Sequence, residues 1–199
     1  MELILASASP RRRELLSLAG YDFTVEVSDA EEVLIPGTPQ QLVEHLAFLK
    51  AEDVARKHCH ALSDTFADEE EKVVIIGSDT VVAMDGEILG KPADEEDAFR
   101  MLSELSGKTH QVYTGVAIFL LHEGKINRHL VFSECTDVTM RKLDEEEIRD
   151  YIACGEPMDK AGAYGIQGKA AVFISGIHGD YYNVVGLPIC RLKEIMKSI

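Results

Sequence analysis

The chain has 199 residues, of which 46% are hydrophobic and 28% are charged, and its formal net charge is −15. The length favours a single domain over residues 1–199, and the composition is that of a soluble globular protein without the long apolar run of a membrane helix. With 20 Lys and Arg against 35 Asp and Glu, the long-range field repels polyanions, so we expect neither nucleic acid nor a membrane as a partner. Any bound anion must be held by local groups.

The cysteines and the N-terminus indicate the compartment. Four cysteines lie far apart in the sequence, so free thiols are expected rather than a disulfide framework or a zinc knuckle. The first residues carry an acid, Glu2, and no basic lead before a short apolar run, which is typical of a first strand rather than a secretion signal. We therefore expect a cytoplasmic protein.

The first half of the chain predicts two helices placed between strands. Its expected elements, in chain order, are a strand over 3–6, a helix over 9–19, a helix over 38–57, a solvated loop over 58–72, and a strand over 73–84 that turns at Asp85-Gly86 into a strand over 87–89. Ser9 and Pro10 give the first helix its cap and first residue, and Thr38 with Gln41 gives the second a capping box.

The second half predicts further strands joined by short turns. Its expected elements are a helix over 94–106, strands over 111–121 and 130–141, a helix over 144–154, a glycine-rich loop over 161–168, a hairpin around 178–180, and a last helix after Pro188. Because helices and strands interleave while several strands follow one another through tight turns, the sheet should be mixed. The predicted fold class is α/β or α+β with one substantial mixed sheet.

Three arginines, Arg11 to Arg13, follow the first strand at a helix start, where the macrodipole already presents positive charge. They are explained if an anion sits among them, because the strand, the small residues before Ser9 and the helix start form a nest of donors that suits phosphate. The alternative is a capped helix whose arginines point to water. We prefer that alternative for Arg13 and the phosphate interpretation for Arg11 and Arg12.

Charged residues also interrupt apolar patterns at three other places. Lys50 falls inside the apolar stripe of its helix, which suggests a buried partner or a side chain that reaches out to water. Asp79 interrupts a strand that is otherwise apolar, so it suits a general base or a metal ligand better than a structural salt bridge. Lys91, held extended by the following proline, is either presented from a strand end or a solvated turn residue. Gly77 is expected to allow a ligand close to the backbone.

The histidines offer no catalytic pattern. The run from His58 to His60 places its side chains in different directions on a helix, so a metal site there is not expected. The other histidines considered are interpreted as surface or capping residues: His45, His110, His129 and His178.

Five strings, in this order and spacing, closely resemble the Maf family of nucleoside triphosphate pyrophosphatases: ASASPRR, GSDT, LGKP, SGKTHQVYTGVA and EPMDKAGAYGIQG. The likeness covers nearly the whole chain, and five such strings together are highly specific. It implies a two-lobed α/β protein, with a mixed twisted sheet and flanking helices around a central cleft. It also implies hydrolysis of nucleoside triphosphates to monophosphate and pyrophosphate with a divalent metal, Mg²⁺ or Mn²⁺, commonly by a homodimer.

The resemblance also implies roles for individual residues. The shared catalytic and phosphate-binding set would be Ser9, Arg12, Glu32, Lys50, Asp79 and Lys91. The branch of the family that acts on dTTP and UTP carries Arg, Thr and Gln where this chain has Arg11, Thr80 and Gln167, whereas the branch that acts on 7-methyl-GTP carries Trp, Gln and Glu. The chain resembles the pyrimidine branch at all three positions, and the Asp159-Lys160 pair also fits that branch.

On this hypothesis the cations and Ser9 surround the triphosphate and neutralise the charge of the leaving pyrophosphate. Asp79 orients or deprotonates a water aimed at the α-phosphorus, or holds the metal together with Glu32; the sequence leaves both roles open. Arg11, Thr80 and Gln167 would read the pyrimidine base. The rival hypotheses are a 7-methyl-GTP pyrophosphatase and a nucleotide-binding regulator of cell division that does not hydrolyse, and modified pyrimidine nucleotides are further candidate substrates.

Overall fold

A mixed β-sheet forms the centre of the computed structural model, which describes residues 1–63 and 72–199. Within these residues the strand order is β2-β1-β3-β5-β6-β7, with β4 paired to the end of β3. β1 is parallel to β2 and β3, and the other pairs are antiparallel. The strands are β1 (Glu2–Leu5), β2 (Thr24–Val25), β3 (Lys72–Met84), β4 (Glu87–Leu89), β5 (Thr109–His122), β6 (Lys125–Met140) and β7 (Ile174–His178). The predicted mixed sheet is confirmed.

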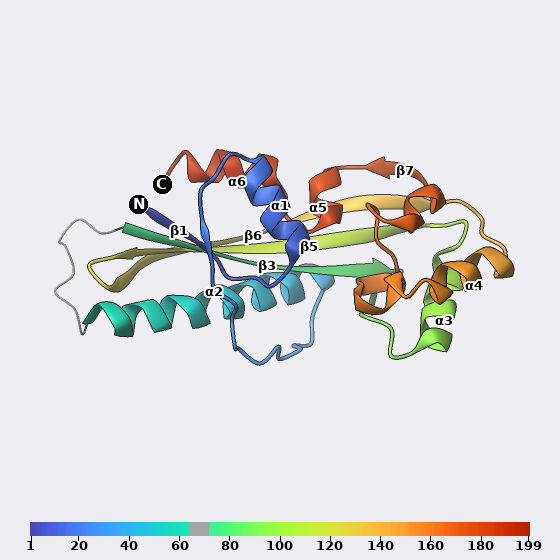
Figure 1. Ribbon diagram of the computed structural model, residues 1–199, viewed down its shortest axis with the longest axis horizontal. Coiled ribbons are helices and arrows are strands. Elements are labelled where there is room, and N and C mark those ends of the chain that lie inside the picture. The colour runs from blue at the N-terminus through green and yellow to red at the C-terminus, as the bar shows by residue number, and fades with distance from the viewer. Residues whose placement is uncertain (64–71) are drawn as a thin grey trace.

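Helices cover both faces of this sheet and its far end (Figure 1). The longest, α2, lies along one face, while α1, α5 and α6 lie on the other, and α3 and α4 pack together at the end away from the termini. The helices are α1 (Pro10–Leu18), α2 (Pro39–Ser63), α3 (Glu95–Leu105), α4 (Glu145–Ala153), α5 (Tyr181–Val185) and α6 (Ile189–Met196). Three short 3₁₀ turns, η1 (Glu156–Asp159), η2 (Ala161–Ala163) and η3 (Lys169–Phe173), lie between α4 and β7.

The alternation of side chains along β3 divides the core between the two faces. Val74 and Ile76 belong to the large apolar cluster that includes α1 and α6, whereas Val73 and Ile75 belong to the cluster that includes α2. Successive side chains of a strand point to opposite faces. The uninterrupted apolar run of β3 therefore follows from its burial on both faces.

Gly77 lets helix α2 lie close to the sheet. A Cβ at Gly77 would come 2.5 Å from the carbonyl oxygen of Ala47, and a Cβ at Gly115, the cross-strand partner of Asp79 on β5, would clash with the carbonyl of Val43. The expectation that Gly77 admits a ligand is therefore wrong, since the close neighbour is the backbone of α2. The same contact brings Lys50, one turn after Ala47, beside Asp79.

The helix caps agree with the sequence analysis. Ser9 Oγ accepts a hydrogen bond from the backbone nitrogen of Arg12 at the start of α1. Thr38 and Gln41 form the reciprocal bonds of a capping box, and Asp144 does the same for α4. Each cap satisfies N–H groups that the first helical turn leaves unpaired.

Three further expectations of the sequence analysis are wrong. Helix α2 continues to Ser63, so residues 58–63 are helical rather than part of a loop; the rest of that expected loop, 64–71, lies outside the described residues. No hairpin forms around 178–180 in this described segment, because β7 pairs with β6 and Asp180 then caps helix α5. His110 is not a surface residue, since it is fully buried on β5.

Strand β3 continues beyond the end of its parallel neighbour β1, and this offset leaves part of one edge of β3 without a partner strand. β1 pairs with β3 up to Ile76, and β4 pairs with β3 again only from Val82. Between these points one edge of β3 faces a space beyond the carboxyl end of β1, which is where open α/β sheets usually bind ligands. In the part of the chain that the structure describes, no helix has the length and apolar character that a membrane span needs.

Candidate active site

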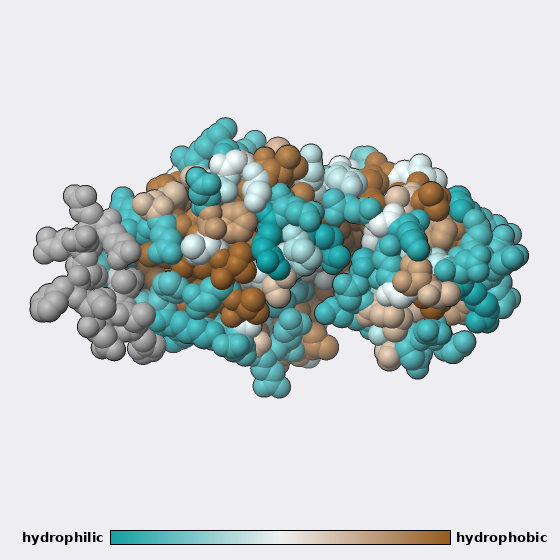
Figure 2. Space-filling view, in the orientation of Figure 1, coloured by the Kyte–Doolittle hydropathy of each residue, from teal (hydrophilic) through white to brown (hydrophobic). Residues whose placement is uncertain are grey.

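A cavity of about 1120 Å³ opens at the uncovered edge of β3. Its walls come from the turn between β1 and α1, from the segment before α2, from α2 itself, from the ends of β3 and β4, and from the segment after α4. In Figure 2 the surface is hollowed between the part over α1 and α2 and the part over α3 and α4, and hydrophilic side chains gather around the hollow. The cavity thus lies between the two lobes.

Every residue that the sequence analysis assigned to the site lines this one cavity. They are Ser9, Arg11, Arg12, Glu32, Lys50, Asp79, Thr80, Lys91 and Gln167. They come from six separate stretches of the chain, so the fold gathers them from remote positions. Arg13, which we expected to point to water, is exposed and is not part of the lining.

Lys50 joins the two acids of the site. Its Nζ lies 2.6 Å from Asp79 Oδ1 and 2.9 Å from Glu32 Oε1. The hydrogen bond from Lys50 holds the pKa of Glu32 below its ordinary value. Lys50 therefore has a partner rather than a side chain that escapes to water, and Asp79 is buried, with one oxygen on the ammonium. The arrangement favours the charged form of the Glu32 carboxylate.

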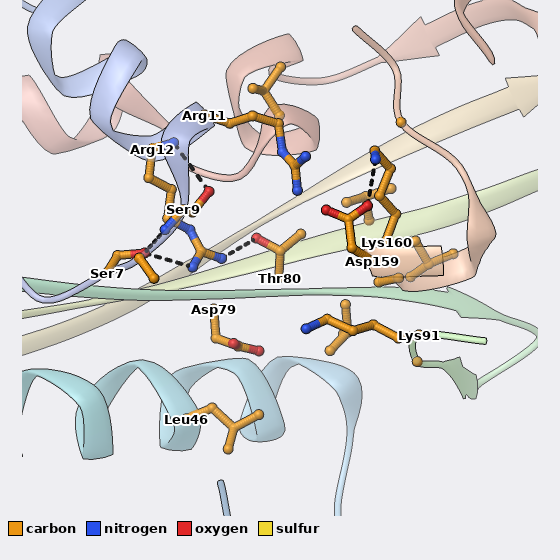
Figure 3. A pocket seen from close by; sticks show the side chains of 18 of the residues that line it. Ser7, Ser9, Arg11, Arg12, Leu46, Asp79, Thr80, Lys91, Asp159 and Lys160 are labelled. Atoms are coloured by element: carbon orange, nitrogen blue, oxygen red, sulfur yellow. Dashed lines mark hydrogen bonds and ion pairs between the residues drawn. The ribbon is translucent and has the colours of Figure 1, made fainter. Parts of the chain in front are cut away.

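The side chains of Asp79 and Thr80 point to opposite faces of β3 (Figure 3). Asp79 points towards α2, and Thr80 points towards Arg12 at the start of α1. Arg12 donates from Nη2 to Thr80 Oγ1 at 3.0 Å and from Nε to the carbonyl oxygen of Gly186 at 2.9 Å. Burial lowers the pKa of the Arg12 guanidinium, while the nearby Asp79 charge opposes that shift. Arg12 is thus a fixed cation at the cavity wall.

Three of the cations that line the cavity lack an acidic partner among the described residues. No carboxylate there lies within 4.0 Å of the charged nitrogens of Arg11, Arg12 or Lys91. In a chain with a net charge of −15, cations left without carboxylates around a single cavity are the mark of an anion site. Arg11 and Arg12, at the start of α1, line this cavity together with Lys91, which follows β4.

The segment after α4 contributes groups that the sequence analysis missed. Glu156 lines the cavity wall and accepts hydrogen bonds from the Tyr151 hydroxyl at 2.9 Å and from the Lys169 backbone nitrogen at 3.0 Å. A Cβ at Gly168 would clash with this carboxylate. The sequence could therefore have indicated this contact through Gly168, since a glycine at that position allows another group, here the Glu156 carboxylate, to lie close to the backbone. Glu156 fixes the turn that presents Gln167.

Apolar side chains form another part of the wall. They include Leu42 and Leu46 on α2, Val81 and Val82 on β3, and Ile166 beside Gln167. An apolar wall next to a few fixed polar and charged groups is typical of sites for small organic ligands. The cavity therefore offers one region to charged groups and another to a flat, less polar group.

The carboxylates of the site fit a divalent cation that arrives with a phosphorylated ligand. Carboxylate oxygens are preferred ligands of Mg²⁺ and Mn²⁺, and Lys50 occupies only one oxygen of Glu32 and one of Asp79. Among the described residues no group of three or more His, Cys, Asp or Glu is placed to hold a metal. Two carboxylates together with phosphate oxygens are a common magnesium environment.

A model of the family of Maf-like proteins matches residues 2–199. The chain belongs to the Maf family. A relative from Agathobacter rectalis, named a dTTP/UTP pyrophosphatase, is 52% identical over 100% of this chain and 97% of its own length. One from Clostridium acetobutylicum with the same name is 52% identical over 98% and 96%. Among solved structures, the Staphylococcus aureus Ham1 protein is a distant match to this Maf chain, with a TM-score of 0.39, 18% identity, and coverage of 70% and 72%.

Proposed function

We propose that this protein is a nucleoside triphosphate pyrophosphatase that hydrolyses dTTP and UTP to the monophosphate and pyrophosphate. The observation that carries the proposal is the single cavity in which Arg11, Arg12 and Lys91, without acidic partners, face the paired acids Glu32 and Asp79. Family membership and the names of the relatives, both called dTTP/UTP pyrophosphatases, support the substrate class.

In the proposed mechanism the protein positions the triphosphate and activates a water. Ser9, Arg12, Lys50 and Lys91 surround the phosphates and offset the charge that develops as pyrophosphate leaves. Asp79 Oδ1 is bonded to Lys50, so Oδ2 is the oxygen that orients or deprotonates the attacking water. Lys50 keeps that carboxylate in place, because its Nζ also bonds Glu32.

A divalent metal, Mg²⁺ or Mn²⁺, is the proposed cofactor. Glu32 would hold it through the oxygen that Lys50 leaves available. Asp79 Oδ2 would be the second ligand in the alternative role of that oxygen, in which it binds the metal instead of acting on the water. When bound, the metal would withdraw charge from a phosphate oxygen. Removal of divalent metal with a chelator is expected to abolish release of pyrophosphate, and addition of Mg²⁺ or Mn²⁺ is expected to restore it.

Arg11, Thr80 and Gln167 are proposed to set the preference for a pyrimidine. Gln167 is exposed at the rim of the cavity, and its amide both donates and accepts, which matches the edge of a uracil ring. Modified pyrimidine nucleotides present a similar edge and belong to the same proposed substrate class.

The further proposals concern the setting of the enzyme. The family resemblance supports a homodimer, and the net charge of −15 argues against nucleic acid or membrane partners. We also propose one domain over residues 1–199 and a cytoplasmic location. Sizing in solution tests the oligomeric state.

The decisive experiment is a panel of nucleoside triphosphates, incubated with Mg²⁺ or Mn²⁺ and assayed for pyrophosphate. We expect dTTP and UTP to be turned over faster than 7-methyl-GTP. The variant Asp79→Asn keeps the shape and removes the charge, and should lower kcat by a factor of about 100 or more. Asp150→Asn, an exposed change on α4, is the matched control. Binding of dTTP without pyrophosphate release, or turnover unaffected by Asp79→Asn, would contradict the proposal.

A further inference from the structure

A buried polar chain lies behind Thr80, outside the cavity. Thr114 on β5 is the cross-strand partner of Thr80 on β3, and its hydroxyl oxygen lies 2.9 Å from that of Thr80. Thr114 is fully buried and does not line the cavity. On its other side it donates to the backbone carbonyl of Asn183 on α5 at 2.8 Å. Thr114 can therefore affect a bound ligand only through its neighbours.

The protons of this chain can be placed by counting donors. A threonine hydroxyl has one proton and two lone pairs. The proton of Thr114 goes to the Asn183 carbonyl, which can only accept, so in the bond between the two threonines Thr80 must be the donor. The Thr80 oxygen is then left with lone pairs alone. One of them accepts from Arg12 Nη2 at 3.0 Å.

The direction of these bonds has a consequence for Arg12. A guanidinium only donates, so it needs an acceptor at Thr80, and a Thr80 proton turned towards Arg12 would remove that acceptor. Thr114 keeps the proton turned the other way. The same guanidinium donates from Nε to the carbonyl of Gly186 at 2.9 Å and from Nη1 to Ser7 Oγ at 3.4 Å. Each of its three nitrogens therefore has a partner in the protein, and these bonds set the direction of the remaining N–H groups.

We propose that Thr114 is a positioning residue of the active site, which orients the Thr80 hydroxyl as an acceptor and thereby holds Arg12 in place for the phosphates. The inference rests on the proposed function, since Arg12 is there a phosphate ligand. Thr80 then cannot donate to a nucleobase, because its only proton is committed to Thr114. Its influence on the substrate passes through Arg12, or through a lone pair that accepts from the ligand.

The first test compares Thr114→Val with Thr114→Ser in pyrophosphate release from dTTP. Valine keeps the volume and removes the hydroxyl, so kcat/KM should fall about tenfold, the effect of one hydrogen bond lost from an oriented charged group. Serine keeps the hydroxyl and should stay within about twofold of the wild type. The matched control is Thr139→Val, because Thr139 on β6 forms the same kind of hydroxyl pair with Thr109 on β5, 2.8 Å apart and outside the cavity; it should change nothing.

The second test separates positioning from mere folding. In a double-mutant cycle, Thr114→Val should cost little in a Thr80→Val background, because the chain is already broken there. Helix α5 is expected to stay in place, since Asn183 Nδ2 also donates to the Val112 carbonyl at 2.9 Å. If Thr114→Val does not fold, Thr80→Val carries the same prediction. A full tenfold cost in both backgrounds, or a serine variant as weak as the valine variant, would overturn the inference.

A base-free ligand distinguishes this inference from the proposed function. Calorimetry with inorganic pyrophosphate and Mg²⁺ should show binding weakened several-fold by Thr114→Val and unchanged by Thr139→Val. If the wild type binds pyrophosphate but releases none from dTTP or UTP, the proposed function fails while the comparison of variants still decides the role of Thr114. Equal affinity of wild type and Thr114→Val, or no binding by the wild type, would overturn that role.

Discussion

Lys50 shows how a single misplaced charge can organise a site. Its ammonium lies between Glu32 and Asp79, so it holds two acids together that would otherwise repel each other and the substrate. Both side chains of the Lys50 and Asp79 pair are largely shielded from water. In such surroundings a charge interaction is stronger than at the open surface. The pair is therefore the part of the site whose loss should be most visible.

Replacement of Lys50 tests this role directly. Lys50→Met is expected to lower kcat/KM for dTTP by about 100-fold, because a fixed cation near the developing charge is lost. It should also raise the pKa of Glu32, which the hydrogen bond from Lys50 now lowers. The acidic limb of the kcat/KM profile should then move to higher pH. Lys108→Met, at an exposed position outside the cavity, is the control; an unchanged profile in Lys50→Met would contradict the assignment.

The residues of the site could be predicted to different degrees. Lys50, Asp79 and Lys91 stood out because charges break apolar or strand patterns, which a single sequence reveals. The partners of Lys50 could not be predicted, since Glu32 lies in an irregular segment with no periodic signal. His110 was misjudged for a related reason: its burial depends on a partner, Tyr164, whose hydroxyl lies 2.7 Å from Nε2 and comes from a remote loop.

At the scale of elements, the segment between β2 and α2 carries Glu32 and is held by side chains of α2, of which Asp53 makes two of the bonds. Asp53 Oδ2 accepts from the Ser28 hydroxyl at 3.0 Å and from the Asp29 backbone nitrogen at 2.8 Å. Lys57 joins the same cluster through ion pairs with Asp29 and Asp53. These bonds end three residues before Glu32, so they set the position from which its carboxylate reaches Lys50.

Release of this segment should affect turnover more than stability. Asp53→Ala is expected to lower kcat/KM several-fold, while unfolding changes by less than about 1 kcal/mol, because ion pairs near the surface contribute little. Asp53→Asn keeps an acceptor for Ser28 and Asp29 and should be milder. Glu52→Ala, on the same helix and paired only with Arg56 among the described residues, is the control. Equal kcat/KM values for Asp53→Ala and Glu52→Ala would contradict a role for the segment.

The elements themselves were largely predictable, because their signals are local. The caps at Ser9 and Asp144 and the turn at Asp85-Gly86 each depend on a few adjacent residues. The wrong predictions concern segments whose structure is determined by tertiary contacts. Helix α2 runs past the predicted end at 57, and the segment around 178–180 joins β6 through β7 instead of folding on itself, which no local pattern indicates.

At the scale of the whole molecule, the cavity carries a local charge opposite in sign to the net charge of the chain. The chain carries −15 overall, yet the cavity is lined by five basic and four acidic residues. Two of the basic residues are paired with acids, namely Lys50 and Lys160. The local excess is therefore positive, and it acts at close range, where salt screens a partly buried charge much less than an exposed one. The protein can thus repel polyanions at a distance and still bind one small anion.

His110 links the sheet to the segment after α4, so its titration should govern the acid stability of the whole fold. Burial lowers its pKa from 6.5 to about 4. Between these values the unfolded chain binds the proton and the folded chain does not. The free energy of unfolding therefore decreases as the pH is lowered from 6.5 to about 4, by about 3 kcal/mol in all. Denaturant unfolding of His110→Gln from pH 7 to pH 4 should show a flatter loss than the wild type. His129→Gln, at an exposed site, should keep the wild-type slope, and the same slope in His110→Gln would refute the linkage.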